Sequence, residues 1–310
     1  MEKQTGCVHI YCGDGKGKTT CGMGLCTRAA GYGYRVLIYQ FMKDNSTSER
    51  KVLLLSPNVT FVPGQDKIKF SFLMTPEEKA EQKRYYEEQF QKVTEKAVQE
   101  EYDVLFLDEL PEFQRTVLDS MRQPLEERRV QIARASGVVT FPSDFMLVAA
   151  MNPCPCGYYP DRNKCRCTQP QIEKYLGKVS GPLLDRIDLC VELQPVDILH
   201  LQTKITGESS EQMRERIERA RKMQEKRYAG TEYRFNGDVS SADVDHYCSL
   251  GETEKNVMEQ LYHTLELSAR AYHRILKTAR TIADLEEQEN IAKEHLLEAA
   301  CYRPSGEYWG

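Results

Sequence analysis

The chain has 310 residues, of which 40% are hydrophobic and 29% are charged, and its formal net charge is -5. This balance is typical of a soluble protein with one large or two modest domains. The negative net charge excludes a general attraction to nucleic acid, so any such contact has to use a local basic patch. The longest uncharged apolar stretch, residues 145–151, has the length of a strand and is far too short to cross a membrane.

The cysteine content indicates the cellular compartment. The chain has 11 cysteines, and its N-terminal segment MEKQTGCVHIYCG lacks the apolar core of a signal peptide. An odd number of cysteines without an export signal indicates a reducing cytoplasm rather than a disulfide framework. We therefore expect a cytoplasmic protein without a membrane partner.

The first part of the chain predicts strands alternating with helices. Residues 7–12 predict a buried strand, residues 19–33 a helix, and residues 35–43 a second strand that is buried on both faces. Residues 74–103 predict a long amphipathic helix, and the sequence Thr75-Pro76-Glu-Glu78 supplies the capping signals at its start.

The rest of the chain continues this alternation and then becomes helical. Residues 104–109, 145–152 and 189–194 predict three more strands, and residues 111–129 predict a helix that is broken near Pro124. The pattern predicts an α/β fold with a five-stranded, mostly parallel sheet flanked by helices. Only helices are predicted after about residue 200, at 209–228 and within 252–301, and they form a C-terminal helical subdomain.

A glycine-rich turn lies between the first strand and the first helix, in YCGDGKGKTTCGMG (residues 11–24). The backbone N–H groups of such a turn bind phosphate oxygens, helped by the positive end of the following helix. Lys18 is expected to reach the β- and γ-phosphates of ATP, and Thr19 to hold Mg²⁺. The expected nucleotide-binding residues are Gly13, Asp14, Gly15, Lys16, Gly17, Lys18, Thr19 and Thr20. Because Cys12 occupies the first glycine position of the strict phosphate-loop pattern, a glycine turn without a ligand is the alternative.

Polar residues follow two of the predicted strands. Asp108 ends an apolar strand, where its carboxylate can hold Mg²⁺, and Glu109 can polarise an attacking water. The alternative for this pair is a solvated strand end. Asn152 ends the next strand, where its amide can orient the same water, or can instead cap the loop that follows.

Four cysteines cluster directly after Asn152. Cys154, Cys156, Cys165 and Cys167 offer four soft ligands in one loop. Four thiolates suit tetrahedral Zn²⁺, and a closed set of ligands indicates a structural rather than a catalytic site. The C-x-C spacing is less common than C-x-x-C, so an iron–sulfur cluster and unliganded thiols stay as alternatives.

The N-terminal motifs carry one family resemblance. They are GDGKGKTTCGMGLCTRAAGYGYRVLIYQFMK, SERKVLLLSPNVTF, FLMTPEEKAE and YDVLFLDE. On these motifs, residues 1–109 resemble the phosphate-loop ATP:corrinoid (cob(I)alamin) adenosyltransferases. That family also lacks glycine at the position of Cys12. The resemblance implies transfer of an adenosyl group from ATP to a reduced corrinoid, a step of cobalamin metabolism.

The later motifs carry a second resemblance. They are LFLDELPEFQRTVLDSMRQPLEERRVQIARASG, FPSDFMLVAAMNPCPCGYY, CRCTQPQIEKYLGKVSGPLLDRIDLCVEL and LSARAYHRILKTARTIADL. From about residue 104 to residue 303 the chain resembles the magnesium-chelatase-like AAA+ ATPases, in their competence-associated, ComM-like branch. This resemblance implies a ring-forming homo-oligomer that hydrolyses ATP and acts on DNA.

The second resemblance also implies roles for particular residues. Asp108 and Glu109 match the Walker B pair, and Asn152 matches the sensor asparagine. Arg186 matches the arginine finger that acts on a neighbouring subunit, and Arg270 matches the second sensor arginine. From the residues alone, Arg186 reads equally well as part of a local ion pair with Asp185 and Asp188, and Arg270 as a charge on a helix surface.

The two resemblances meet in YDVLFLDEL, where both families carry an apolar strand that ends in Asp-Glu. Both families also place an extra strand between the phosphate-loop strand and this one, so we expect a single hybrid sheet. The expected parts are the phosphate-loop region (residues 1–109), the remainder of the AAA+ core with the cysteine cluster (110–200), and a helical lid (201–310).

Three functional hypotheses follow. The first is ATP hydrolysis of the AAA+ type, coupled to remodelling of DNA or protein. The second is corrinoid adenosyltransfer, and the third is an inactive nucleotide-binding fusion product. One helix offers basic residues to DNA, namely Arg214, Arg216, Arg219, Arg221, Lys222, Lys226 and Arg227. Glutamates interleave with them, so we favour a solvated helix surface.

Overall fold

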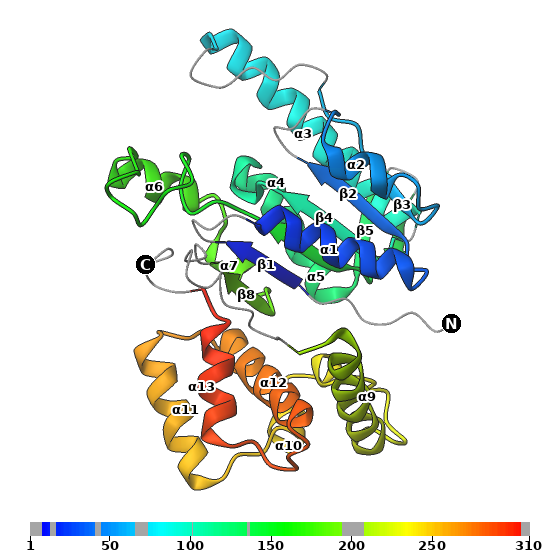
Figure 1. Cartoon of the computed structure of the whole chain (residues 1–310), viewed down its shortest axis with the longest axis vertical. Coiled ribbons are helices and arrows are strands. Elements are labelled where there is room, and N and C mark those ends of the chain that lie inside the picture. The colour runs from blue at the N-terminus through cyan, green and yellow to red at the C-terminus, as the bar shows by residue number, and fades with distance from the viewer. Residues whose placement is uncertain are drawn as a thin grey trace. The chain divides into compact units, whose positions relative to one another are not determined.

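The computed structural model describes residues 8–12, 17–40, 45–65, 74–100, 102–134, 137–193 and 208–304. These residues fall into two units, one within 8–193 and one within 208–304 (Figure 1). Each unit has its own buried core. None of the described helices is both long and apolar enough to cross a membrane.

A parallel sheet forms the centre of the first unit. Its strand order is β3-β2-β4-β7-β1-β8, and every neighbouring pair is parallel. The strands are β1 (Val8–Cys12), β2 (Val36–Gln40), β3 (Val59–Phe61), β4 (Val104–Asp108), β7 (Met146–Ala150) and β8 (Leu189–Glu192). The predicted α/β class is confirmed, whereas the predicted count of five strands was wrong. The additional strand, β3, has only 3 residues, too few to stand out as an apolar run.

Strand β7 lies between β1 and β4 in the sheet. The chain therefore has the extra strand that we expected between the phosphate-loop strand and the strand ending in Asp108. Residues of β2 and β4 are buried along their whole length, in keeping with a sheet that is covered on both faces.

Helix α1 (Lys18–Gly31) packs across β1, β4 and β7. The helix lies close to β4 at Gly22, where an added Cβ would be only 2.4 Å from Cε2 of the buried Phe106. The core between α1 and the sheet contains Met23, Cys26, Ala30, Val36, Ile38, Val104, Phe106, Val148 and Ala150.

The long predicted helix is present as α3 (Pro76–Gln99). Its capping signals act as expected, because the Glu78 backbone N–H donates to Thr75 Oγ1 (3.3 Å) and the Thr75 N–H donates to Glu78 Oε2 (2.8 Å). The other helical segments of this unit are α2 (Ser48–Leu53), η2 (Leu110–Glu112), α4 (Arg115–Ser120), α5 (Arg122–Glu127), α6 (Gln169–Leu176) and α7 (Gly181–Leu184).

Two local predictions need correction. The helix predicted for residues 111–129 begins only at Arg115, after the short segment η2, whereas its predicted break near Pro124 is present at Met121, between α4 and α5. Pro124 lies in the first turn of α5, where the missing N–H costs nothing because first-turn N–H groups lack partners within the helix. The sequence analysis also missed an antiparallel hairpin, β5 (Arg129–Arg134) with β6 (Gly137–Pro142).

The second unit consists of helices, as predicted for the C-terminal part. They are α9 (Ser210–Arg227), η3 (Asn236–Asp238), α10 (Val244–Tyr247), α11 (Glu252–Thr264), α12 (Ala269–Leu285) and α13 (Lys293–Cys301). Helix α12 packs against both α9 and α13. Its Asp284 is fully buried and accepts hydrogen bonds from Arg227 and Asn236, so this core is built around a paired charge.

Candidate nucleotide and metal sites

The parallel strands bring several predicted residues to one edge of the sheet. Asp108 is the last residue of β4, and Asn152 follows the end of β7. Gly13, Asp14, Gly15 and Lys16 lie outside the described residues. The description resumes at Gly17, which adopts the left-handed conformation (φ 112°) that glycine tolerates without strain and which caps the N-terminus of α1. Lys18 and Thr19 are therefore in the first turn of α1, and Thr20 is exposed on the same helix.

Thr19 and Asp108 meet across this edge. Thr19 Oγ1 lies 3.2 Å from Asp108 Oδ1 and 3.4 Å from Oδ2, and Asp108 is only 1% exposed. A hydroxyl and a carboxylate are oxygen ligands of the kind that Mg²⁺ prefers. The structure thus brings together the two residues predicted to hold Mg²⁺, and their donor atoms fit this ion.

Gln40 is a member of this group that the sequence analysis missed. It pairs with Asp108 across the β2–β4 ladder, and its Nε2 donates to Asp108 Oδ2 (3.4 Å). Its own Oε1 accepts from Thr47 Oγ1 (3.4 Å). A polar residue at the end of an otherwise apolar strand was the signal that could have revealed it. Gln40 and Thr19 thus both contact the Asp108 carboxylate, Gln40 from β2 and Thr19 from α1.

Glu109 and Asn152 form a second pair beside the first. Asn152 Nδ2 donates to Glu109 Oε2 (2.9 Å) and Oε1 (3.2 Å). Glu109 itself is in the left-handed region (φ 55°, ψ 50°), a conformation that costs a residue with a side chain about 1–2 kcal/mol. Such strain is common where a side chain has to be aimed at a reacting group. Asn152 thus contacts the carboxylate predicted to polarise water, and is more than a loop cap.

Tyr175 of α6 lines the same region. Burial raises the pKa of its phenol above the usual range, and the negative charges of Glu109 and Glu112 raise that pKa further. Tyr175 is therefore a neutral hydroxyl next to the Glu109–Asn152 pair. It is 4% exposed.

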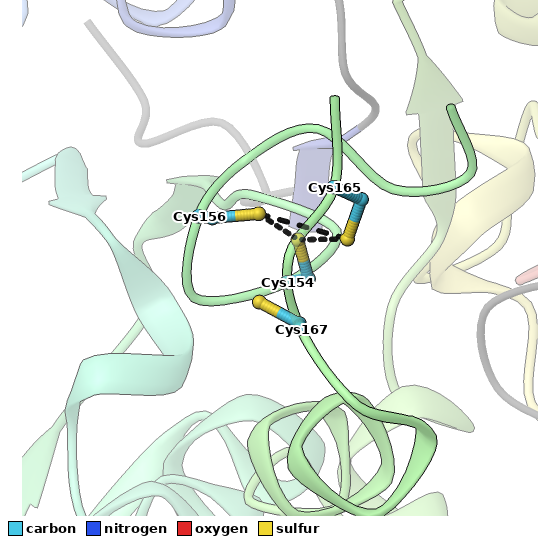
Figure 2. A group of neighbouring side chains, drawn as sticks. All are labelled: Cys154, Cys156, Cys165 and Cys167. Atoms are coloured by element: carbon cyan, nitrogen blue, oxygen red, sulfur yellow. Dashed lines mark hydrogen bonds between the residues drawn. The ribbon is translucent and has the colours of Figure 1, made fainter. Parts of the chain in front are cut away.

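The four predicted cysteines converge in the loop after β7 (Figure 2). Their sulfur atoms all lie within 4.8 Å of one another. Three Sγ–Sγ distances are 3.4 Å (Cys154–Cys156), 3.6 Å (Cys156–Cys165) and 3.8 Å (Cys154–Cys165). Four thiolates about 2.3 Å from one zinc ion would be about 3.8 Å apart, so the set fits a single tetrahedral ion. In a four-iron cluster each cysteine binds a different iron, which requires wider spacing.

The thiols of this cluster differ in acidity. Burial acts to raise the pKa of Cys156, but hydrogen bonds from backbone N–H groups and from neighbouring thiols outweigh burial and lower that pKa below its ordinary value. Burial raises the pKa of Cys165 and Cys167. Because the thiolate is the metal ligand, Cys156 is more readily deprotonated for metal binding than Cys165 or Cys167.

Arg186 is buried rather than displayed on the surface. It is 6% exposed, pairs with Glu126 of α5 and donates from Nη1 to the Pro182 carbonyl (2.5 Å). The ion pair therefore joins segments 60 residues apart and is not the local pair with Asp185 or Asp188 that the sequence allowed. To act on a neighbouring subunit, Arg186 would have to leave Glu126.

The remaining predicted residues lie in the second unit. Arg270 is exposed near the start of α12. In the basic helix α9, Arg227 is bound to the buried Asp284 and Arg219 pairs with Glu287 (2.7 Å). Arg221 stacks on Phe235, with its guanidinium carbon 3.9 Å from the ring centre. Much of the predicted basic surface is thus used within the chain.

Comparison with protein families finds both expected resemblances. Residues 4–122 match the ATP:corrinoid adenosyltransferase BtuR/CobO/CobP family. Residues 95–201 match the magnesium chelatase subunit ChlI family, and residues 207–303 match its C-terminal counterpart. The first two matches overlap at residues 95–122, which contain β4 with Asp108 and the adjoining Glu109. The chain therefore joins parts similar to two families.

Individual relatives divide in the same way. Competence protein ComM of Haemophilus influenzae is 46% identical over 201 residues, which are 64% of this chain and 38% of that protein. The uncharacterized protein YifB of Escherichia coli is 43% identical over 202 residues, 64% of this chain and 39% of that protein. The corrinoid adenosyltransferase of Escherichia coli is 37% identical over 60 residues, 19% of this chain and 31% of that protein. The chain spans less than half the length of each of these relatives.

Proposed function

We propose that the chain binds ATP with Mg²⁺ and hydrolyses it in the manner of an AAA+ ATPase. The observation that carries this proposal is the pairing of Glu109 with Asn152 beside the Thr19–Asp108 pair, at one edge of the sheet. Hydrolysis needs groups that hold the cation and a carboxylate that aligns water, and these two pairs supply them. The match of residues 95–201 to the chelatase subunit family supports the same reading.

The residues have distinct roles in this proposal. Lys18 neutralises phosphate charge, and Thr19 and Asp108 hold Mg²⁺, which adds positive charge at the β- and γ-phosphates when bound. Glu109 accepts a hydrogen bond from the attacking water, whose oxygen bonds to the γ-phosphorus while the bond to the β-phosphate oxygen breaks. Asn152 fixes the plane of the Glu109 carboxylate, so that one oxygen faces the water. The products are ADP, phosphate and the proton that the attacking water loses.

Product identification tests the proposal against its main alternative. Purified protein would receive labelled ATP, Mg²⁺, DNA and a chemically reduced corrinoid. We expect ADP and phosphate from the unaltered chain, and at least a hundredfold less of both from Glu109→Gln with ATP still bound, in line with the loss of a charge-stabilising or orienting group. ATP turnover that survives in Glu109→Gln would refute the assigned role.

A second candidate function is adenosyl transfer to a corrinoid substrate. The specific observation in its favour is that residues 4–122, which include the glycine-rich turn and α1, match the ATP:corrinoid adenosyltransferase family. In that reaction the nucleophilic corrinoid attacks the C5′ carbon of ATP and releases tripolyphosphate. The same assay therefore detects it as tripolyphosphate with an adenosylated corrinoid. Neither product, from protein that still binds ATP, would favour the third reading, an inactive fusion.

We propose homo-oligomers with shared sites as part of the AAA+ function, with Arg186 as the shared residue. The expected behaviour is loss of hydrolysis in Arg186→Ala without loss of ATP binding. Mixing Arg186→Ala with Glu109→Gln should partly restore turnover, because some interfaces then contain one intact site. Since Arg186 is bound to Glu126, the Glu126→Gln variant should ease its release and keep activity. Absence of restored turnover would count against a shared site.

The cysteine cluster is proposed to hold one structural Zn²⁺. The closed set of four thiol ligands and their spacing support this ion. The proposal has three further parts. ATP hydrolysis is coupled to remodelling of DNA or protein, and residues 201–310 form a helical lid with Arg270 as a nucleotide sensor. The protein acts in the cytoplasm. Stimulation of hydrolysis by added DNA, weakening as salt is raised, would support the DNA partner.

A further inference from the structure

We infer that metal held by the four-cysteine loop positions Asn152 against Glu109, so that the loop controls the hydrolytic carboxylate. The inference rests on the proposed function of Glu109, and it assigns the cluster a role beyond local stability. It follows from where the loop begins, what its turn contacts, and what the Asn152 side chain holds.

The loop and Asn152 are continuous in the chain. Asn152 is followed by the buried Pro153 and then by Cys154, which is 0% exposed. The first metal ligand therefore lies two residues beyond the asparagine, on a segment enclosed by protein. A constraint on the Cys154 sulfur is transmitted to Asn152 through two peptide units and a proline ring, which has little rotational freedom.

The turn of the loop also folds back onto the Asn152 side chain. The Gly157 N–H donates to the Cys154 carbonyl (3.0 Å), and Gly157 has a positive φ of 81°. At this position a Cβ would lie 3.7 Å from Asn152 Oδ1. The turn that carries Cys154 and Cys156 thus lies against the carboxamide oxygen, while the amide nitrogen of the same group faces Glu109.

A bound metal would restrict the conformation of this turn. The segment from Cys154 to Cys167 has no helix or strand, and its sulfur atoms interact with one another through S–H contacts, which are weak hydrogen bonds. One ion bound by four thiolates would replace these contacts and tie the two C-x-C pairs together. Metal binding at such sites supplies ordering free energy directly.

The contact between Asn152 and Glu109 would let a metal-ordered loop hold the Glu109 carboxylate in place. Asn152 Nδ2 lies within hydrogen-bond distance of both Glu109 oxygens, so the position of the amide sets the orientation of the carboxylate. Glu109 lies 43 residues earlier in the chain, directly after β4. Coupling between the metal and Glu109 would therefore run along the chain from Cys154 to Asn152, and then across the Asn152–Glu109 contact between the ends of β7 and β4.

Coupling of this kind is reciprocal, which gives a test that needs no enzymatic activity. Zn²⁺ affinity would be measured by competition with a chromophoric chelator. We expect Glu109→Ala to weaken Zn²⁺ binding about fivefold to tenfold, the lower range of coupling between sites. Glu109→Gln keeps an oxygen that accepts from Asn152 and should stay within about twofold of the unaltered chain, allowing for one weaker hydrogen bond.

Two controls separate this coupling from charge or folding effects. Glu173→Ala removes an exposed carboxylate on α6, closer in sequence to the cysteines, and should leave Zn²⁺ affinity unchanged. If Glu109→Ala does not fold, Asn152→Ala takes its place, with Asn163→Ala as the matched control because Asn163 is exposed in the same loop. Equal Zn²⁺ affinities in Glu109→Ala, Glu109→Gln and the unaltered chain would overturn the inference.

A kinetic cycle then links the metal to hydrolysis. Removing Zn²⁺ from the unaltered chain should lower kcat about tenfold or more, leave ATP affinity within about twofold, and be reversed by added Zn²⁺. In Asn152→Ala the same removal should lower kcat less than about twofold, because the residue that transmits the effect is absent. Equal losses in both proteins would overturn the inference. If no protein hydrolyses ATP, the proposed function fails, while the Zn²⁺ affinities still decide whether metal and Glu109 are coupled.

Discussion

Replacing Gly22 by alanine should destabilise the first unit, although alanine is the better helix former. An alanine Cβ at this position would lie 2.4 Å from Cε2 and 2.8 Å from Cζ of Phe106. Phe106 is 0% exposed in the centre of β4, and the core around it contains Met23, Val148 and other buried side chains. Overfilling such a core costs about 1–3 kcal/mol, whereas replacing glycine within a helix gains about 1 kcal/mol. We expect a net loss of up to about 2 kcal/mol in the free energy of unfolding.

Gly24 provides the matched control in the same helix. An added Cβ there meets no atom within 4 Å, so Gly24→Ala should stabilise the unit by about 0.5–1 kcal/mol. Urea unfolding would be followed by hydrogen exchange on peptides from β4 and from α12, so that the two units are read separately. Gly22→Ala as stable as Gly24→Ala would show that α1 does not pack on Phe106 as described.

Three further predictions concern the nucleotide site, the thiols and the second core. Lys18→Ala should abolish binding of a fluorescent ATP analogue, and unchanged affinity in this variant would refute the phosphate site. Thr19→Val should weaken Mg²⁺-dependent binding of the analogue about tenfold, because it removes a hydroxyl ligand, whereas Thr19→Ser keeps the hydroxyl and should not weaken binding. At about pH 8 an alkylating reagent should modify the exposed Cys21 and Cys301 but not the buried Cys26 or Cys248. Burial raises the pKa of Cys26 to about 12 and that of Cys248 to about 11, which leaves almost no reactive thiolate at either residue. Mass spectrometry of the native protein after labelling would check this, and rapid labelling of Cys26 would contradict it. Asp284→Ala should destabilise the second unit by about 3–5 kcal/mol, because it leaves the charge of Arg227 without its buried partner; a change below about 1 kcal/mol in urea unfolding would mean that the pair contributes little.

The sequence predicted elements well where a local signal was strong. Helix α3 has its capping box where Thr75 and Glu78 indicated it, and β2 and β4 are the continuous apolar runs that predict buried parallel strands. The sequence analysis missed elements that are very short or that lack a continuous apolar run. Strand β3 has 3 residues, and the β5–β6 hairpin mixes polar and apolar residues, so a search for apolar runs passes over both.

The candidate site shows the same division. The identities of Thr19, Asp108, Glu109 and Asn152 were expected from motifs, but their contacts depend on strand order, which motifs do not state. Gln40 was missed because its role comes from pairing with Asp108 across the sheet. The partner of Arg186 was likewise unpredictable, because Glu126 is distant in sequence and offers no pattern to read.

The strand order has a consequence for how the two ancestries are joined. Strand β1, from the adenosyltransferase-like part, lies between β7 and β8, which belong to the chelatase-like part. Strand β4 in turn has β2 on one side and β7 on the other. Neither part can therefore complete its own ladder of backbone hydrogen bonds. If the chain were cut just before β4, each fragment would expose strands without their hydrogen-bonded neighbours. The two fragments would then have to associate in order to fold, as the halves of a split reporter protein do.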